Sequence, residues 1–455
     1  MHFGTLSIFQ NYRDEQSDLD VVKGELALAK LAEDTGFDSF WAVEHHFFPY
    51  SMCPDNFQFL AQVAGQTKRI QLGTGAVIVP WNDPYRIAAK AALLDNQSGG
   101  RALLGFGRGL ARREYAAMNV AMDEARGRFD EGTQLVLEAL EKGFYEADTS
   151  YYHHPRCTLR PRPLRSFSDR SYCIGVSPDS AVHAAVIGAK LMVLAQQPWE
   201  IFRKQALEPY QEKWRSLRGS TPLTPLCGSL LFCDEDGDRA RELGKKFVKE
   251  YYFTIVEHYE IVGKHFSQTK GYEHYASAAE AISSMGLDAM ADLYASVNLY
   301  GTPDEIEVQI RAQKEILGVD HDMLVMPKYG SMTLADLQAV APGIRYADLS
   351  RLTEVRSPGL RHRHYAPQAR VVLIDTPAEV PVNEGNAFIG LTTHARPQAL
   401  GLHETPADTT AYARLLFQFF RRSDRADIET IYCQRVEPEG IGRALMDRLE
   451  RAAKG

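Results

Sequence analysis

The 455-residue chain contains few cysteines and no long apolar run. Its 6 cysteines are too sparse for a disulfide framework, and the nearest pair, Cys227 and Cys233, lacks the spacing of a zinc knuckle. No uninterrupted apolar stretch reaches the roughly 20 residues that a membrane-spanning helix needs. The segment Met1–Gln10 has neither the basic start nor the cleavage site of a secretion signal. These absences exclude a disulfide-rich secreted fold and predict a cytoplasmic protein without a membrane partner.

The chain also lacks an excess of positive charge. It has 51 Lys and Arg against 59 Asp and Glu, a formal net charge of −8. A surface that binds nucleic acid over the whole molecule is basic, so we predict no nucleic-acid partner. With 45% hydrophobic residues, the chain is long enough to bury a large core, and its length allows two or three domains.

Apolar β-type runs alternate with helical patterns through the first 335 residues. Two segments break the rhythm: residues 144–170, which we interpret as a functional excursion, and residues 257–299, which we interpret as a helical insertion or lid. Repeated βα units predict a parallel sheet or barrel, and eight of them predict a (β/α)8 TIM barrel. The eight β-type runs are residues 2–9, 37–43, 70–79, 102–106, 173–176, 191–195, 225–232 and 322–325.

The second of these runs ends in ionisable side chains, Glu44, His45 and His46. Strand ends at the rim of an α/β barrel are where catalytic groups collect, so Glu44 and His45 are candidate catalytic residues. A zinc site and a solvated strand end are the alternatives. No third ligand lies nearby at metal spacing and the motif is not H-E-x-x-H, so no metal is predicted.

Three further features fit an anion. Glycines around Gly107 would let backbone amides approach an anion that Arg108 grips, although tight turns have the same pattern. Arg126 lies near the predicted start of a helix, where a cation is unfavourable unless an anion is bound. Ser177 and Ser180 open another helix, with a simple N-cap as the alternative. Together they predict a phosphate-bearing cofactor.

With these residues in view, residues 1 to about 335 resemble the bacterial luciferase family of flavin-dependent monooxygenases. The resemblance implies a TIM barrel that uses reduced FMN, supplied by a separate flavin reductase. It also implies molecular oxygen as co-substrate, acting through a C4a-hydroperoxide. It runs through FGTLSIFQ, AEDTGFDSFWAVEHHF, IQLGTGAVIVPWNDPYRIA, LLDNQSGGRALLGFGRG and YGTPDEI.

The same resemblance assigns roles to single residues. His45 matches the family's catalytic histidine, and we expect Glu44 to hold its tautomer. Gly75-Ala76 matches a non-proline cis peptide beside the isoalloxazine. Phe47 and Phe48 are expected walls of a dry pocket. The predicted cofactor-binding residues are Gly75, Ala76, Gly107, Arg108, Arg126, Ser177 and Ser180.

The end of the chain reads as a separate unit. We predict a barrel over residues 1–340, a basic Pro/Gly linker over 341–368 and a small Rossmann-like α/β domain over 369–455. SPGLRHRHYAP, AYARLLFQFFRRSDRA and VEPEGIGRALMDRLERAA are similar to the linker and C-terminal domain of long-form threonylcarbamoyl-AMP synthases. The synthase's catalytic domain is replaced by the barrel, so its activity is not carried over. The unit either places its linker over an active site or is a solubilising or dimerising appendage.

We therefore predict a two-component FMN-dependent monooxygenase that oxygenates a small metabolite, with natural-product biosynthesis as its setting. Its partners would be a small-molecule substrate and a flavin reductase, and the chain would form a homodimer. Two alternatives stay open: a deazaflavin-dependent oxidoreductase on the same barrel, and a non-catalytic protein that binds flavin or a nucleotide.

Overall fold

In the computed structural model of the protein, the chain divides into two compact units, residues 1–347 and 348–455. Most of the predicted linker lies outside the part of the chain that the structure describes. Within that part, no helix combines the length and apolar character needed to cross a membrane. The described residues are 1–263, 265–269, 272, 275–332, 367, 369–395, 397–426, 428–437 and 441–453.

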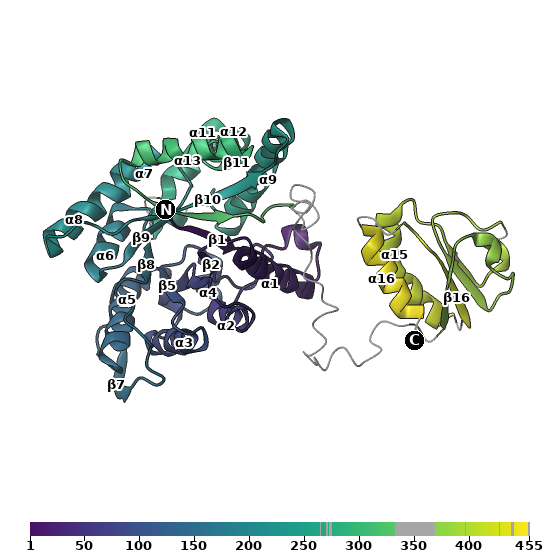
Figure 1. The fold of residues 1–455 in the computed structure, drawn as a ribbon, viewed down its shortest axis with the longest axis horizontal. Coiled ribbons are helices and arrows are strands. Elements are labelled where there is room, and N and C mark those ends of the chain that lie inside the picture. Colours follow the sequence, from purple (N-terminus) through teal and green to yellow (C-terminus); the bar gives the residue numbers. More distant parts are fainter. Residues whose placement is uncertain are drawn as a thin grey trace. The chain divides into compact units, whose positions relative to one another are not determined.

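The first unit is a closed parallel barrel with helices around it (Figure 1). Each strand pairs with the next one around the ring, and the last strand returns to pair in parallel with the first. The predicted TIM barrel is thus confirmed. Its strands are β1 (Phe3–Ser7), β2 (Ser39–Ala42), β3 (Gln71–Thr74), β5 (Ala102–Gly107), β8 (Ser171–Ile174), β9 (Lys190–Leu194), β10 (Leu226–Cys233) and β12 (Asp322–Met326). A short strand, β4 (Val77–Ile78), adds to β5.

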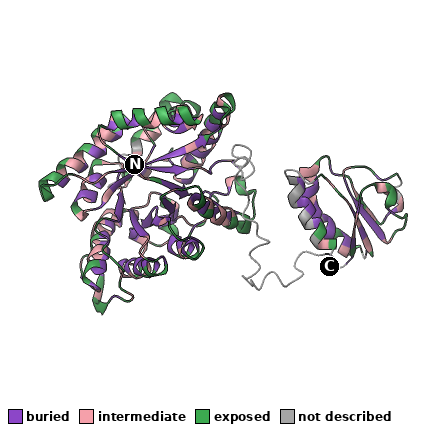
Figure 2. Cartoon of the chain, in the orientation of Figure 1, coloured by how far each residue is buried: buried purple, intermediate pink, exposed green. Residues whose placement is uncertain are grey.

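Several of the helices between the strands begin at polar caps. The side chains of Ser17, Asp55, Asp83, Ser177 and Thr302 each accept a backbone N–H of the first turn, as N-caps do. The inner helix faces are buried and the outer faces exposed (Figure 2). These helices are α1 (Asp18–Asp34), α2 (Asn56–Gln66), α3 (Pro84–Gln97), α4 (Arg112–Ala117), α5 (Ala125–Lys142), α6 (Pro178–Ile187), α7 (Trp199–Phe202), α8 (Glu208–Arg218), α9 (Gly237–His258) and α13 (Pro303–Leu317). A π-helical turn, η4 (Arg203–Leu207), joins α7 to α8.

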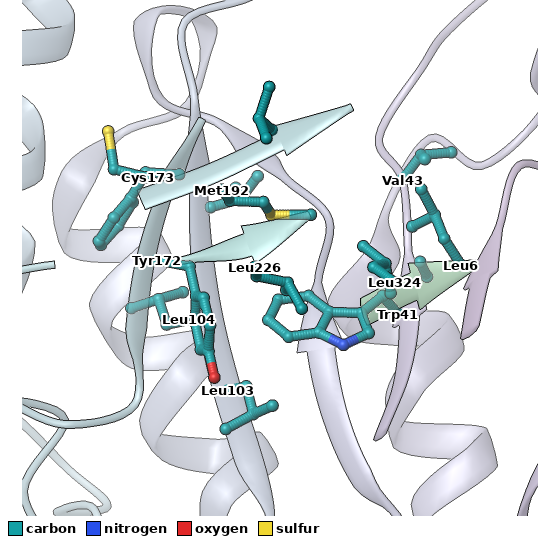
Figure 3. Packing of buried hydrophobic residues seen from close by; sticks show 14 of the residues in the cluster. Leu6, Trp41, Val43, Leu103, Leu104, Tyr172, Cys173, Met192, Leu226 and Leu324 are labelled. Atoms are coloured by element: carbon teal, nitrogen blue, oxygen red, sulfur yellow. The ribbon is translucent and has the colours of Figure 1, made fainter. Parts of the chain in front are cut away.

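Trp41 fills much of the barrel interior (Figure 3). Its ring meets Tyr172 edge-on, with centroids 4.8 Å apart, and its Nε1 donates to the Ser39 hydroxyl at 2.9 Å. A Cβ on Gly73, in the neighbouring strand, would come within 2.3 Å of the indole. The glycine is therefore required by close packing, because the interior has no room for both side chains.

The two predicted interruptions take different forms. Residues 144–170, the predicted functional excursion, contain an antiparallel hairpin, β6 (Phe144–Asp148) with β7 (His153–Thr158). The Tyr152 hydroxyl between these strands donates to the Arg128 carbonyl at 3.1 Å, so the hairpin turn reaches the first turns of α5. Residues 257–299 form the expected helical insertion. It contains α10 (His265–Gln268), α11 (Ala276–Met285) and α12 (Leu287–Ser296), before β11 (Leu299–Gly301).

The second unit is a small α/β domain, as predicted. Its four strands are all parallel, in the order β13, β16, β14, β15. The Tyr412 hydroxyl joins helix to sheet by donating to the Ile389 carbonyl at 2.9 Å. The strand β15 was missed because it has only three residues. The elements are β13 (Arg370–Ile374), β14 (Asn386–Ile389), β15 (Leu402–Glu404), α15 (Thr409–Arg425), β16 (Thr430–Gln434) and α16 (Ile441–Ala453).

A buried ion pair lies where the barrel closes. Lys328, just after β12, places its Nζ 2.9 Å from Oε1 of Glu25 on α1. The Ser7 hydroxyl at the end of β1 donates to Oε2 of the same carboxylate at 2.7 Å. Both charged side chains are buried, so each charge depends on the other to offset its loss of hydration.

Lys328→Met should lower the free energy of unfolding by about 3–5 kcal/mol, because it leaves the Glu25 carboxylate buried without its cation. The double variant Lys328→Met/Glu25→Gln should recover most of this loss. All 4 tryptophans lie in the first unit, so tryptophan fluorescence in urea titrations reports the barrel alone. A single variant within about 1 kcal/mol of the parent would contradict the interpretation.

Candidate active site

His45 lies at the barrel rim, three residues after β2, and both of its ring nitrogens have partners. Nδ1 is 3.1 Å from Oε1 and 3.2 Å from Oε2 of Glu114. Nε2 is 3.3 Å from the hydroxyl of Tyr259, which follows α9. A carboxylate on one nitrogen fixes the orientation of the ring, and the other nitrogen then faces a group with an exchangeable proton. This arrangement suits an imidazole that moves a proton.

Glu114, on α4, has a fully buried side chain. Its carboxylate also accepts the backbone N–H of His46 at 2.7 Å, and Nε2 of His258 lies 3.7 Å away. Burial alone would raise the pKa of Glu114, but the charge of His45, the contact with His258 and the His46 amide together lower it. The carboxyl group therefore stays ionised in the folded protein.

His258 completes the cluster around Glu114. Its ring is 3% exposed and stacks on Tyr50, with centroids 4.2 Å apart. Neither ring nitrogen has a hydrogen-bond partner among the described residues, and burial lowers the pKa of the imidazole. The ligand atoms of His45, Glu114 and His258 lie within 4.8 Å of one another, a set that could hold a metal ion. The sequence did not predict Glu114, Tyr259 or His258 as neighbours of His45.

The expected role of Glu44 is wrong. Its carboxylate is buried but accepts from the Ile78 amide at 2.9 Å and from Trp81 Nε1 at 2.8 Å, and lies 3.1 Å from Nε2 of His46. It therefore orients His46 and the segment after β4, while Glu114 orients His45. Neighbouring residues on an extended chain point in opposite directions, which is why adjacency in sequence misled the assignment.

Two predicted phosphate-binding segments meet at the start of α6. Nη2 of Arg126 is 3.4 Å from the Ser180 hydroxyl, and Ser180 is 3.1 Å from the hydroxyl of Ser177. Nη1 of Arg126 contacts Asp130 at 3.3 Å. Ser177 is also the N-cap of the helix, so the alternative of a simple N-cap is confirmed as well. A guanidinium, two hydroxyls and a helix N-terminus form a suitable anion cradle.

Arg108, directly after β5, carries a second guanidinium at the barrel rim. Its Nη1 is buried and has no hydrogen-bond partner among the described residues. Its guanidinium lies over the ring of Tyr272, 4.1 Å from the centroid. Burial raises the pKa of Tyr272, against the charges of both Arg108 and Arg126. The charges of the two arginines thus both reach the same tyrosine side chain.

The peptide between Gly75 and Ala76 is cis, as predicted. Gly107 lies beside it, and a Cβ there would come within 3.2 Å of the Ala76 Cβ and 2.8 Å of the Ile78 side chain. The Asn56 side-chain amide donates to the Ala76 carbonyl at 3.2 Å. This segment therefore keeps a side-chain-poor surface at the rim. Phe47, an expected pocket wall, is 62% exposed and does not serve as one.

Comparison with known families matches both units. Residues 1–321 match the luciferase-like monooxygenase family. Residues 332–454 match the C-terminal domain of threonylcarbamoyl-AMP synthase. Both resemblances drawn from the sequence are confirmed.

Several individual proteins similar to the chain are monooxygenases. The alkanal monooxygenase alpha chain of Aliivibrio fischeri is 25% identical over 288 residues, 62% of this chain and 80% of that protein. The oxygenase component of the flavin-dependent trigonelline monooxygenase of Acinetobacter baylyi is 29% identical over 198 residues, covering 42% and 54%. The crystal structure of monooxygenase RslO1 from Streptomyces bottropensis aligns with a TM-score of 0.61 and 27% identity, covering 76% of this chain and 97% of that one.

Glu114→Gln should make stability less dependent on pH. Because folding lowers the pKa of this carboxyl, its ionised form stabilises the folded state above its unfolded pKa of about 4.3. That stabilisation is lost as the pH falls toward the folded pKa. In urea titrations, the parent's free energy of unfolding should fall more steeply than the variant's between about pH 5 and pH 3.

The matched control is Glu307→Gln, which removes a carboxylate whose side chain is 60% exposed and which pairs with Arg311 on the surface of α13. It should follow the parent at every pH, because exposed pairs contribute little. Parallel curves for Glu114→Gln and the parent would show that the buried carboxylate is not held ionised.

Proposed function

The chain belongs to the luciferase-like monooxygenase family and is a flavin-dependent monooxygenase, and we propose that its flavin is FMN, delivered in reduced form by a separate reductase. The observation that carries this proposal is the unpartnered buried Nη1 of Arg108, near the cradle of Arg126, Ser177 and Ser180. A buried guanidinium nitrogen without a partner is costly unless a ligand completes it.

The residues present fit FMN. A phosphate bound between Arg108 and Arg126 would receive charge-assisted hydrogen bonds and the hydroxyls at the start of α6. The ring system would extend toward Gly107 and the Gly75-Ala76 peptide, where close packing against Ile78 and Leu6 leaves no space for a side chain on either glycine. Bound reduced FMN supplies the electrons that activate molecular oxygen.

His45 has the proton-handling role in this proposal. Glu114 holds Nδ1, which leaves Nε2 and the Tyr259 hydroxyl as the exchangeable side of the pair. The imidazole would deliver or accept the proton that oxygen transfer requires, and Glu114 would stabilise its cationic form. Tyr259 would hold the ring until substrate replaces it.

The reductase partner, the domain boundaries, the homodimer and the biosynthetic setting are part of the same proposal. The match to an oxygenase component supports a two-component system with a flavin reductase as partner. The family matches at residues 1–321 and 332–454 support a barrel at 1–340, a linker at 341–368 and a small domain at 369–455. The homodimer stays a prediction for sedimentation analysis, and natural-product biosynthesis stays one for product identification.

Cofactor choice is tested directly. Purified protein is supplied with reduced FMN or with reduced deazaflavin, and oxygen uptake and product mass are measured across a panel of small metabolites. A gain of one oxygen atom with reduced FMN supports the proposal. Turnover with reduced deazaflavin alone would replace it with an oxidoreductase, and binding without turnover of any substrate would favour a non-catalytic flavin-binding protein.

Arg108→Ala and Arg126→Ala should each weaken binding of reduced FMN by about 1.5–3 kcal/mol, the value of a charge-assisted hydrogen bond. Anaerobic titration measures the change. Riboflavin, which has no phosphate, should bind the parent and both variants equally. Arg128→Ala is the control on α5, because its guanidinium is already paired with Glu124 at 2.8 Å. Unchanged FMN affinity in both test variants would remove the phosphate assignment.

His45→Ala should bind reduced FMN nearly as well as the parent but lose product formation by about 10²–10⁴-fold, the contribution of a positioned proton-transfer group. Oxygen uptake should continue with release of hydrogen peroxide. His46→Gln is the control, since glutamine can still donate to Glu44. Equal product yields from His45→Ala and the parent would exclude the residue from the reaction.

A further inference from the structure

A cavity of about 440 Å³ lies beyond the carboxyl ends of β8 and β9, under α11 and α12. Pockets of a few hundred Å³ hold drug-sized ligands. The cavity adjoins the proposed cofactor site at two points. Val176, a lining residue, directly precedes Ser177. Tyr275, also a lining residue, is near enough to Arg108 to be affected by its charge. Burial raises the pKa of Tyr275 to about 12, and the Arg108 guanidinium acts against this rise.

The lining of the cavity is largely apolar, as in many pockets that bind small molecules. Most lining side chains are apolar, among them Leu194, Trp199, Phe202 and Met290. None of the lining residues in the part of the chain that the structure describes is charged. A charged ligand group would lose its hydration here without gaining a counter-ion, at a large cost in free energy. The FMN phosphate is excluded by the same argument, because its cations lie outside the lining.

One polar atom of a lining residue needs a partner. Oε1 of Gln205, on the π-helical turn η4, is buried and has no hydrogen-bond partner among the described residues. A carbonyl oxygen in this state is satisfied by an N–H or O–H donor. The insertion between β10 and β11 covers the cavity with Ala278 and Ala281 of α11, whose small side chains leave the space open.

We propose that this cavity is the substrate site, and that it takes a neutral, largely apolar molecule bearing one hydrogen-bond donor that meets Gln205. The inference rests on the proposed function, since it names the substrate class of the same enzyme. It assigns substrate selection to β8, β9, η4 and the helical insertion, while cofactor binding belongs to the strand ends from β3 to β8.

The test uses two fluorescent probes with the same ring skeleton. N-phenyl-1-naphthylamine is neutral and has an N–H donor, and 1-anilinonaphthalene-8-sulfonate adds one negative charge. The full-length protein should bind the neutral probe at least about tenfold more tightly than the sulfonate, because the lining offers no cation. Equal or tighter binding of the sulfonate would overturn the proposal.

Variants then locate the binding. Ala281→Trp and, independently, Ala278→Trp should each weaken binding of the neutral probe at least about tenfold, by filling the cavity. Ser283→Trp, on the exposed face of the same helix, is the control and should bind like the parent. Gln205→Leu should weaken the neutral probe several-fold. Probe binding unchanged in both tryptophan variants places the probe elsewhere and overturns the proposal.

Reduced FMN is titrated against the same variants. Parent-like FMN affinity in Ala281→Trp and Ala278→Trp is expected. A loss of FMN affinity in these variants with the fold intact by circular dichroism would assign the cavity to the cofactor and overturn the substrate proposal. Failure of the parent itself to bind reduced FMN would instead refute the proposed function, while the probe results would still decide the chemistry of the cavity.

Discussion

The parallel pairing of β12 with β1 is the constraint on which the rest of the barrel depends. Registered pairs from Phe3 with Met323 to Thr5 with Val325 join residues more than 300 positions apart. Only this closure makes all the strands point the same way around a ring, so that their carboxyl ends form one rim. His45, Arg108 and Ser177 follow three different strands and lie at one rim because of it. The Glu25–Lys328 pair holds the closing strand from the same end.

Within that rim, one buried carboxylate organises the candidate catalytic groups. Glu114 is 69 residues from His45 in sequence, holds its ring and the next backbone amide, and lies 3.7 Å from the imidazole of His258. A buried charge is tolerable only when its partners are all in place. The geometry of His45 is therefore set by a short helix, α4, rather than by its own strand. A change in the packing of α4 would displace the imidazole of His45.

Much of the barrel was predictable from local pattern, and much of the site was not. Alternating apolar runs and polar caps such as Ser177 and Thr302 locate strands and helices because both depend on nearby residues. Glu114 carries no such signal, since its role follows only from where α4 packs. The resemblance correctly indicated His45 at the rim and the cis peptide at Gly75, but adjacency wrongly paired Glu44 with His45. The hairpin strand β7 and the short β15 gave too little periodicity to identify.

The order of the rim segments along the chain has a consequence for recombination between related genes. Apart from Tyr259, the groups that would hold and operate the cofactor come from residues 45–180, while the lining of the 440 Å³ cavity comes almost wholly from residues 193–293. The two sets meet near Val176 and Ser177. A single recombination event in the surface turn after α6, near Gly188, would exchange one set between relatives and leave the other intact. A barrel arranged in this way can acquire new specificity by crossover, without first passing through a form that has lost its chemistry.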